Sequence, residues 1–229
     1  MYKVVIAYKR KPGMDVESFQ RRWLEGHAPI AAALPGLRRY VQSHSLVQGY
    51  RKADLPCDGI SEMWFDSREA WQRALADPVA MDIQADEQAF VDVSRKTVMP
   101  VEVLVIKDGA IPGNGVKNVE FVNQRPGMDL HAFRAYWRDV HGPLASQIPP
   151  LRRYEQNHLQ LHEYGEGRPT PAFDGLAITW FDSTAAMKEG AATPIYAATR
   201  ADEANFLPDG HLPFIVTREH EISLRRAQR

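Results

Sequence analysis

Two histidines occupy the same short motif in distant parts of the chain, and they are the first candidates for chemistry. His27 and His141 each follow a tryptophan by four residues and precede a proline by two. The four-residue step places the imidazole beside the indole on one helix face. A partly buried imidazole that titrates near neutral pH is suited to act as a general acid or base. The alternative is structural: each histidine satisfies a backbone carbonyl where Pro29 or Pro143 interrupts the helix.

A second repeated group consists of polar side chains at every other position of a predicted strand. Alternation along a strand places such residues on one sheet face. They are Tyr40, Gln42 and His44 near the N-terminus and Tyr154, Gln156 and His158 further on. This row suits the wall of a polar-lined cavity, with Tyr40 as the donor to a carbonyl or phenol oxygen. A solvated strand face is the alternative.

Glu62 marks the clearest chemical difference between the two parts of the chain, because Ile178 occupies the matching position. The strand pattern places Glu62 on the same face as Asp58, Ile60 and Trp64. A carboxylate with apolar neighbours tends to have a raised pKa and can serve as an acid or a base. The isoleucine therefore predicts that the second part cannot do the same work. An exposed or arginine-paired glutamate is the alternative.

All these residues belong to an internal duplication. Residues 12–44 and 126–158 align without a gap at an offset of 114, and 16 of the 33 positions are identical. The likeness resumes at residue 58 with an offset of 116. Repetition at this level indicates two copies of one structural unit. The predicted domains are 1–108 and 116–229, joined by a Gly-rich linker at 109–115.

The predicted elements of each copy follow the ferredoxin-like order of strand, helix, strand, strand, helix, strand. The first copy has strands at 2–8, 37–47, 59–65 and 98–106, and helices from 15 and from 67. Helices on one side of a four-stranded sheet leave its other face bare, and two such sheets in one chain can bury that face. We therefore expect an α+β fold in which two ferredoxin-like halves form an intramolecular pseudo-dimeric α+β barrel.

The composition excludes several classes of function. The chain has 229 residues, of which 44% are hydrophobic and 25% charged, as in ordinary globular proteins. The net charge of −1, without a basic block, argues against a nucleic-acid partner. The apolar run Val4–Tyr8 is too short for a signal or membrane segment. The single cysteine, Cys57, fits a reducing compartment, so a cytoplasmic location is expected. Neither a zinc-binding pattern nor a phosphate-binding glycine loop is present, so we expect no metal and no cofactor.

Four motifs of the first copy, taken together, resemble the EthD family. They are Lys9-Arg10-Lys11-Pro12-Gly13-Met14, Phe19-x-x-x-Trp23-x-x-x-His27-x-Pro29, Leu34-Pro35-Gly36-Leu37-Arg38-Arg39-Tyr40 and Asp58-Gly59-x-x-Glu62-x-Trp64-Phe65-Asp66-Ser67. The resemblance covers nearly all of the first copy, and the second with more departures, so the chain looks like a tandem member. The second copy departs at Ile178 and Pro150, where the first has Glu62 and Gly36.

The resemblance implies a ferredoxin-like fold of the dimeric α+β barrel superfamily, with a ligand cavity between sheet and helices. It implies no single reaction. Relatives are linked to ether degradation and to dehydration or decarboxylation in polyketide pathways. The wider superfamily also holds lactone isomerases and cofactor-free monooxygenases.

The leading hypothesis is a cofactor-independent lyase or isomerase that acts by acid–base catalysis on a small hydrophobic carbonyl, lactone or aromatic compound. His27 would move the proton, Tyr40 would hold the substrate oxygen, and Glu62 would orient His27 or act as a second acid. The residues expected to contact substrate are Trp23, His44, Trp64, Asp58, His141 and Tyr154.

Two other functions remain open at this point. The first is a non-catalytic small-molecule-binding or auxiliary protein of a catabolic pathway, and the second is a cofactor-free monooxygenase. In each case the partner is a small molecule rather than a nucleic acid or a membrane. A homodimer of the two-copy chain is possible, since sheet edges can associate.

Overall fold

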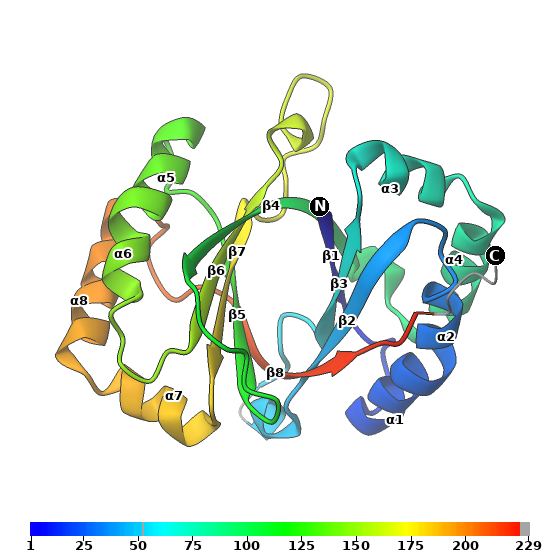
Figure 1. Cartoon of the computed structure of the whole chain (residues 1–229), viewed down its shortest axis with the longest axis horizontal. Coiled ribbons are helices and arrows are strands. Elements are labelled where there is room, and N and C mark those ends of the chain that lie inside the picture. Colours follow the sequence, from blue (N-terminus) through cyan, green and yellow to red (C-terminus); the bar gives the residue numbers. More distant parts are fainter. Residues whose placement is uncertain (52, 225–229) are drawn as a thin grey trace. The chain divides into compact units, whose positions relative to one another are not determined.

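The computed structural model describes residues 1–51 and 53–224 (Figure 1). The chain forms two compact units. The first contains Met1–Val101 and the chain from Glu219 onward, and the second contains Glu102–Arg218. Strands and helices follow one another in the same order in both, as the duplication predicts.

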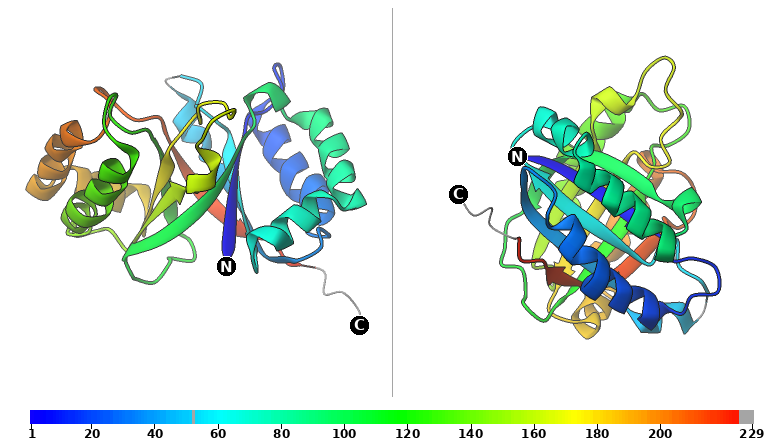
Figure 2. Two further views of the ribbon diagram at one scale, coloured as in Figure 1. Left: turned by 90° about the horizontal axis from the view of Figure 1, so that it is seen from above. Right: turned by 90° about the vertical axis from the view of Figure 1, so that its right-hand side faces the viewer.

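The first unit is a sheet whose helices lie on one of its faces (Figure 2). Strand β1 pairs with β3 on one side and with β4 on the other, and β2 pairs with β3, all antiparallel. Beyond β2, the N–H of Ile222 donates to the carbonyl of Tyr40 at 2.9 Å. The strands are β1 (Tyr2–Tyr8), β2 (Leu37–Ser45), β3 (Gly59–Phe65) and β4 (Thr97–Lys107), and the helices are α1 (Val16–Arg21), α2 (Ala28–Ala31), α3 (Arg68–Leu75) and α4 (Pro78–Phe90), with 3₁₀ turns at Val47–Arg51 and Val93–Arg95.

The second unit repeats this arrangement. Strand β5 pairs with β7 and β8, and β6 pairs with β7, again antiparallel. The strands are β5 (Val116–Val122), β6 (Arg153–Leu159), β7 (Gly175–Phe181) and β8 (Phe214–Glu221), and the helices are α5 (Leu130–Tyr136), α6 (Gly142–Ala145), α7 (Thr184–Ala191) and α8 (Pro194–Asp202), with 3₁₀ turns at Leu161–Glu163 and Glu203–Asn205.

A π-helical turn divides the first long helix of each unit at the place where the sequence predicts an interruption. These turns are Arg22–His27 and Trp137–His141. The N–H of Ala28 donates to the carbonyl of Trp23, five residues earlier. Proline follows in the first turn of the next short helix, where its missing N–H leaves no hydrogen bond unmade. Single π-helical turns are frequent at functional sites, and each histidine of the repeated motif ends one.

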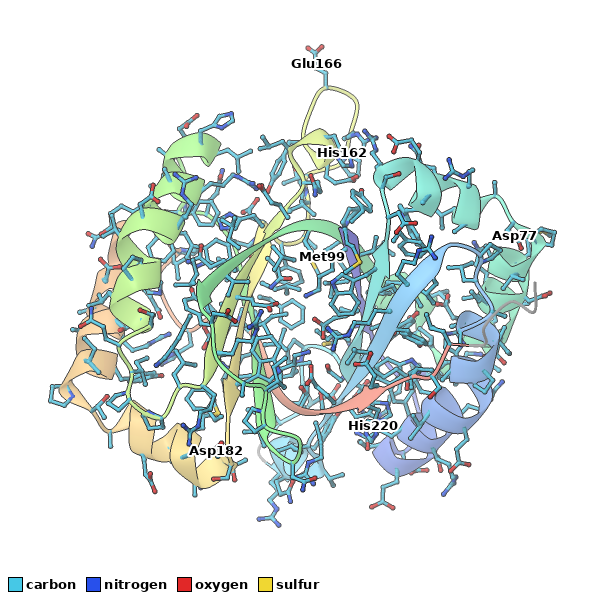
Figure 3. The ribbon with its side chains drawn as sticks, viewed as in Figure 1. Asp77, Met99, His162, Glu166, Asp182 and His220 are labelled. Carbon is cyan, nitrogen blue, oxygen red and sulfur yellow. The ribbon has the colours of Figure 1, made fainter. Side chains whose placement is uncertain are left out.

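The helix starts follow the predicted capping chemistry. Asp15 accepts a hydrogen bond from the N–H of Ser18 at 2.8 Å, and Ser67 accepts one from Ala70 at 3.3 Å. Asp77 caps α4 in the same way (Figure 3). Short polar side chains at these positions satisfy N–H groups that have no partner within the helix.

The compact units do not coincide with the predicted domains 1–108 and 116–229. Their boundaries fall inside strands, between Val101 and Glu102 in β4 and between Arg218 and Glu219 in β8. The predicted linker 109–115 contains no helix or strand. No helix among the described residues combines the length and the apolar character needed to cross a membrane.

Candidate functional site

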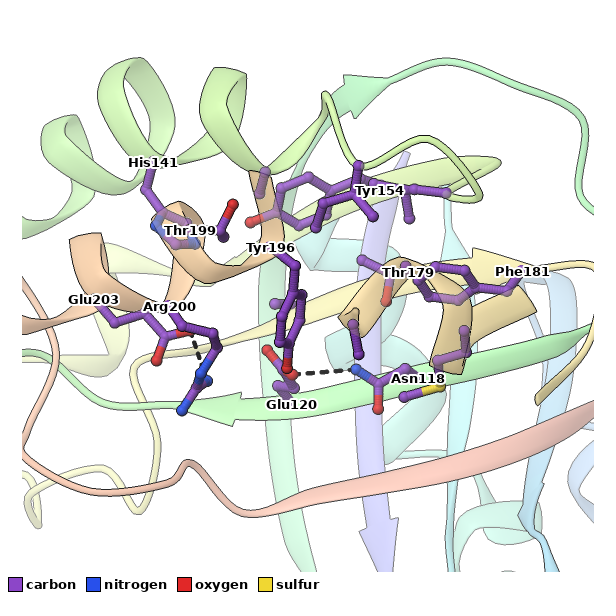
Figure 4. A pocket seen from close by; sticks show the side chains of 17 residues that line it. Asn118, Glu120, His141, Tyr154, Thr179, Phe181, Tyr196, Thr199, Arg200 and Glu203 are labelled. Carbon is purple, nitrogen blue, oxygen red and sulfur yellow. Dashed lines mark hydrogen bonds and ion pairs between the residues drawn. The ribbon is translucent and has the colours of Figure 1, made fainter. Parts of the chain in front are cut away.

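A cavity of about 100 Å³ lies between the sheet and the helices of the second unit (Figure 4). Strands β5, β6 and β7 form one wall, and helices α6, α7 and α8 contribute to the other. Its apolar lining includes Ile148, Leu151, Phe181 and Met187, and its polar lining includes Asn118, Glu120, His141, Tyr154, Tyr196 and Glu203. An apolar space with a few polar groups directed into it is typical of a small-molecule site.

His141 has the geometry of a general base. Its Nδ1 lies 2.9 Å from a carboxylate oxygen of Asp202, so Nδ1–H donates and Nε2 is left without a proton in the neutral ring. The other oxygen of Asp202 accepts from the Tyr136 hydroxyl at 2.6 Å, which fixes the carboxylate. Burial lowers the pKa of His141, although the hydrogen bond to Asp202 opposes this. The imidazole is therefore neutral near pH 7, with Nε2 available to take a proton.

Tyr154 is placed to donate a hydrogen bond into the same cavity. Its hydroxyl oxygen already accepts from the Trp137 indole N–H at 3.1 Å and from the Gln156 amide at 3.2 Å. Within the described residues the hydroxyl donates to no acceptor. Its own hydrogen is therefore free for a ligand oxygen, as a tyrosine O–H is both donor and acceptor.

Two carboxyl groups complete the polar lining. Glu203 accepts from the Arg200 guanidinium at 2.7 Å, and burial raises its pKa to about 7. Glu120 on β5 accepts from the side-chain amide of Asn118 at 3.2 Å, and burial raises its pKa as well. Carboxyls with raised pKa values in a cavity are candidates for acid–base work.

The first unit places the matching histidine in a closed core. Nδ1 of His27 also lies 2.9 Å from a carboxylate, that of Asp86, but its Nε2 is buried and makes no hydrogen bond in the described structure. The side chain is 0% exposed. The positions matching Glu120, Met187 and Tyr196 are Ile6, Trp71 and Ala80, and all three belong to the hydrophobic core. The cavity therefore lies in the second copy, although the catalytic residues predicted from sequence all belong to the first.

The predicted partnership of Glu62 with His27 is wrong, because the two side chains lie on opposite faces of the sheet. Glu62 pairs in register with Val5 and Val41, one position out of phase with Tyr40, which faces the helices. Its carboxylate lies 2.7 Å from Nζ of Lys3. Asp86, on α4, orients His27 instead.

Trp64 shares the face of Glu62 and also lies away from His27. The ammonium group of Lys3 and the guanidinium group of Arg39 lie over its ring, at 5.0 and 4.7 Å from the centroid. Both cations make cation–π contacts with the indole, so its faces have a structural role.

Asp58, another predicted contact to substrate, closes a loop. It is 0% exposed and accepts from the backbone N–H of Arg10 at 2.7 Å and from the Tyr50 hydroxyl at 2.5 Å. Asp174 accepts from Tyr164 in the second unit at 2.7 Å. The aspartate therefore recurs in both copies because it holds the same loop closed. The carboxylate of Asp58 is buried in that role and does not face a ligand-binding cavity.

The polar row on β2 supports the π-helical turn. The amide N–H₂ of Gln42 donates to the Trp23 carbonyl at 3.2 Å and to the Tyr40 hydroxyl at 2.8 Å, and its oxygen lies 3.0 Å from Nε2 of His44. The His44 ring stacks on Trp23 with centroids 4.5 Å apart. Burial lowers the pKa of His44 to about 3. In the first unit, then, Trp23, Tyr40 and His44 belong with Gln42 to a packed, hydrogen-bonded layer.

Sequence reasoning missed Asp86, Asp202, Glu203 and Tyr196. A signal for the aspartates exists, since Asp86-Glu87-x-x-Phe90 recurs as Asp202-Glu203-x-x-Phe206 at the offset of 116. Tyr196 carries no such signal, because alanine occupies its position in the first copy. Cys57 is buried, and burial raises the pKa of its thiol to about 12, which makes it a poor nucleophile. No three metal-binding side chains come together in the described residues.

The fold and the cavity define a protein of the α+β barrel class with two ferredoxin-like halves, which confirms the predicted fold class. The model of the EthD domain matches the chain twice, at residues 11–94 and 125–209. The chain therefore belongs to the EthD family as a tandem two-copy member, as its motifs predict. No curated protein matches the sequence.

Several solved structures resemble the chain over almost its whole length. An anthrone oxidase-like protein aligns with a TM-score of 0.61 and 13% identity, over 96% of this chain and 92% of that one. A proposed monooxygenase from Fusobacterium nucleatum subsp. nucleatum aligns with a TM-score of 0.58 and 8% identity, over 97% and 92%. A proposed chlorite dismutase aligns with a TM-score of 0.54 and 13% identity, over 96% and 94%. At these identities the likeness shows the fold alone.

Proposed function

We propose that the second copy is an acid–base site that removes a proton from a small, largely apolar carbonyl or lactone compound. The reaction would be an elimination or an isomerisation, two of the three reaction types proposed from sequence, but with His141 in place of His27. The observation that supports this most directly is an imidazole that lines a cavity and is fixed through Nδ1 by Asp202.

The proposed proton transfer uses groups already in position. Nε2 of His141 takes the proton from the carbon beside the carbonyl group, and the electron pair of that C–H bond moves to form an enolate. The hydroxyl of Tyr154 donates a hydrogen bond to the enolate oxygen. Donors that are held in place before the reaction stabilise developing charge without reorganisation.

The size of the cavity limits the ligand. An engineered apolar cavity of roughly 150 Å³ holds a molecule as large as benzene. The cavity of about 100 Å³ accordingly suits a compound of a few carbon atoms, or a larger one that extends beyond it. Butanone and γ-butyrolactone are suitable probes, because both have acidic C–H bonds next to a carbonyl group.

Exchange of these hydrogens for deuterium tests the proposal without knowledge of the natural substrate. In D₂O, NMR should show exchange in butanone that is catalysed by the native protein. His141→Ala should lower the rate by roughly 10²–10⁴-fold, the usual contribution of a general base. His27→Asn changes the corresponding histidine of the first copy to a smaller polar residue and should leave the rate unchanged. Full exchange by His141→Ala would overturn the assignment.

Cofactor-free oxygenation is a second candidate, favoured by the names of similar solved structures, one an anthrone oxidase-like protein and another a proposed monooxygenase. Oxidation of an activated phenol also begins with removal of a proton, which His141 could perform. Oxygen consumption with a small phenol, lost in His141→Ala, would support this candidate. Binding of butanone without exchange or oxidation would instead support a binding protein.

A further inference from the structure

Glu120 is a carboxyl group that only the second copy carries on the cavity wall. It lies on β5 at the position of Ile6 in the first unit, and Asn118 lies at the position of Val4. Both first-unit residues are in the hydrophobic core. The second copy thus has a neighbouring acid and amide where its sister has two aliphatic side chains, and both face the cavity (Figure 4).

In the described structure Glu120 forms no ion pair, and burial raises its pKa although the charge of Arg200 opposes the rise. Among the described residues that line the cavity, Arg200 is the one cation, and it is bound to Glu203 at 2.7 Å and lies 3.0 Å from the His211 ring. The only hydrogen bond to Glu120 in the described structure comes from the neutral Asn118 amide. A buried charge without a partner is costly, and a carboxyl in such a place tends to keep its proton.

The other titratable groups around the cavity also favour the protonated form of Glu120. Burial raises the pKa of nearby Tyr196, and the negative charge of an ionised Glu203 raises it further. Burial raises the pKa of Tyr154, and burial lowers the pKa of His141, so both are neutral near pH 7. With Glu203 paired to Arg200, a protonated Glu120 leaves the cavity without net charge.

We propose that Glu120 carries a proton and donates it as a hydrogen bond to an uncharged acceptor oxygen, so that the site selects neutral carbonyl compounds over carboxylates of the same shape. This rests on the proposed function, since it specifies the substrate class of that site. During proton abstraction by His141, Glu120 and Tyr154 would both donate to the enolate oxygen, which accepts two hydrogen bonds. A carboxylic acid kept neutral by an apolar site can serve as such a donor.

Three probes of nearly equal size separate the possible charge states. Butanone is neutral, propionate is an anion of almost the same shape, and sec-butylammonium is a cation. Ligand-observed NMR titrations at pH 7 should show that the native protein binds butanone at least tenfold more tightly than either ion. Glu120→Gln, which keeps a donor, should retain this order. Glu120→Ile, the first-copy residue, should weaken butanone binding by about tenfold, the effect of roughly one hydrogen bond.

Glu189→Gln is the matched control, because Glu189 is exposed on α7, the helix that provides Met187 to the cavity. It should change none of the three affinities. Glu203, with a pKa of about 7, also absorbs in the infrared as a protonated carboxyl group at pH 7. This absorption should therefore decrease in Glu120→Gln by the part that Glu120 contributes, a readout that a purely structural role would not alter.

The outcomes distinguish this inference from the proposed function. If sec-butylammonium binds most tightly and Glu120→Gln abolishes that preference, Glu120 is ionised and the inference fails. If butanone exchange depends on His141 but Glu120→Ile binds butanone as tightly as the native protein, the inference fails alone. If no probe binds the native protein, both the site and the inference are refuted.

Discussion

The two histidines of the repeated motif make the same hydrogen bond but differ in whether a ligand can reach the ring. Each donates through Nδ1 to an aspartate at 2.9 Å. What differs is the surroundings of the ring: His141 lines a cavity, whereas Nε2 of His27 is buried without a hydrogen bond in the described structure. A residue in a repeated motif therefore cannot be assigned a catalytic role from the motif alone, because the neighbours that decide its access lie elsewhere in the sequence.

Asp202 should act as a positioning residue for His141. Asp202→Asn keeps the size of the side chain but no longer requires Nδ1 to carry the proton, so Nε2 would be protonated in part of the molecules. Deuterium exchange into butanone should slow by tenfold or more, with little change in binding, and the loss should appear in kcat rather than KM. Asp86→Asn, the matched change beside His27, should leave exchange intact.

The buried histidines should also make stability depend on pH. His44 is 5% exposed, and burial lowers its pKa to about 3, so the unfolded chain binds a proton that the folded one does not. Stability is then full above about pH 6.5 and falls as the pH decreases below that value. At pH 5 this one group should cost ~2 kcal/mol.

His44→Phe tests this dependence, because it keeps a flat ring against Trp23 and removes the titration. Urea unfolding at pH 7 and pH 5 should show that the variant loses less stability on acidification than the native protein. An equal loss in both would show that His44 is not the group responsible.

At the scale of elements, the sequence was sufficient for the order of strands and helices and for the interruption before Pro29. Those features depend on local rules of periodicity, capping and proline geometry. The location of the cavity was not predictable in this way. It depends on volume differences between α3–α4 and α7–α8, where Trp71 matches Met187 and Ala80 matches Tyr196. A larger or smaller side chain fills or opens a cavity only where helices and sheet pack together. A local sequence pattern does not specify that packing.

Met187→Trp should close the cavity by copying the first unit. There the Trp71 ring packs on Phe65 with centroids 5.1 Å apart, and Phe181, the counterpart of Phe65, lines the cavity. An indole at position 187 would occupy that space, so butanone binding and exchange should both fall by more than tenfold, with the urea midpoint unchanged or higher. Met187→Leu conserves the apolar volume and should keep most of the binding. Native affinity in the tryptophan variant would mean that ligands bind elsewhere.

At the scale of the whole chain, duplication has produced two units with one topology and different interiors. Selection on one fold accounts for what both retain, such as the glutamine that supports each π-helical turn. The interiors then diverged, toward an apolar core in one and a polar-lined cavity in the other. The boundaries of the sequence repeat also differ from those of the compact units, because β4 and β8 each contribute residues to both units.

This division predicts that the last part of the chain stabilises the first unit and is dispensable for the cavity. Beyond Arg218, the His220 ring lies 4.5 Å from that of His44, and the N–H of Ile222 donates to the Tyr40 carbonyl at 2.9 Å. A protein that ends at Arg218 loses both contacts and should be destabilised by about 1–3 kcal/mol, the usual cost of leaving a buried polar group unsatisfied. Urea unfolding followed by tryptophan fluorescence should detect the change, while butanone still binds.

Glu221→Gln is the control for this truncation. It removes only an exposed ion pair with Arg39 and should lower the free energy of unfolding by less than about 1 kcal/mol. If the truncated protein were as stable as the native one, the last part of the chain would not stabilise the first unit. If it lost butanone binding, that part would be needed for the cavity.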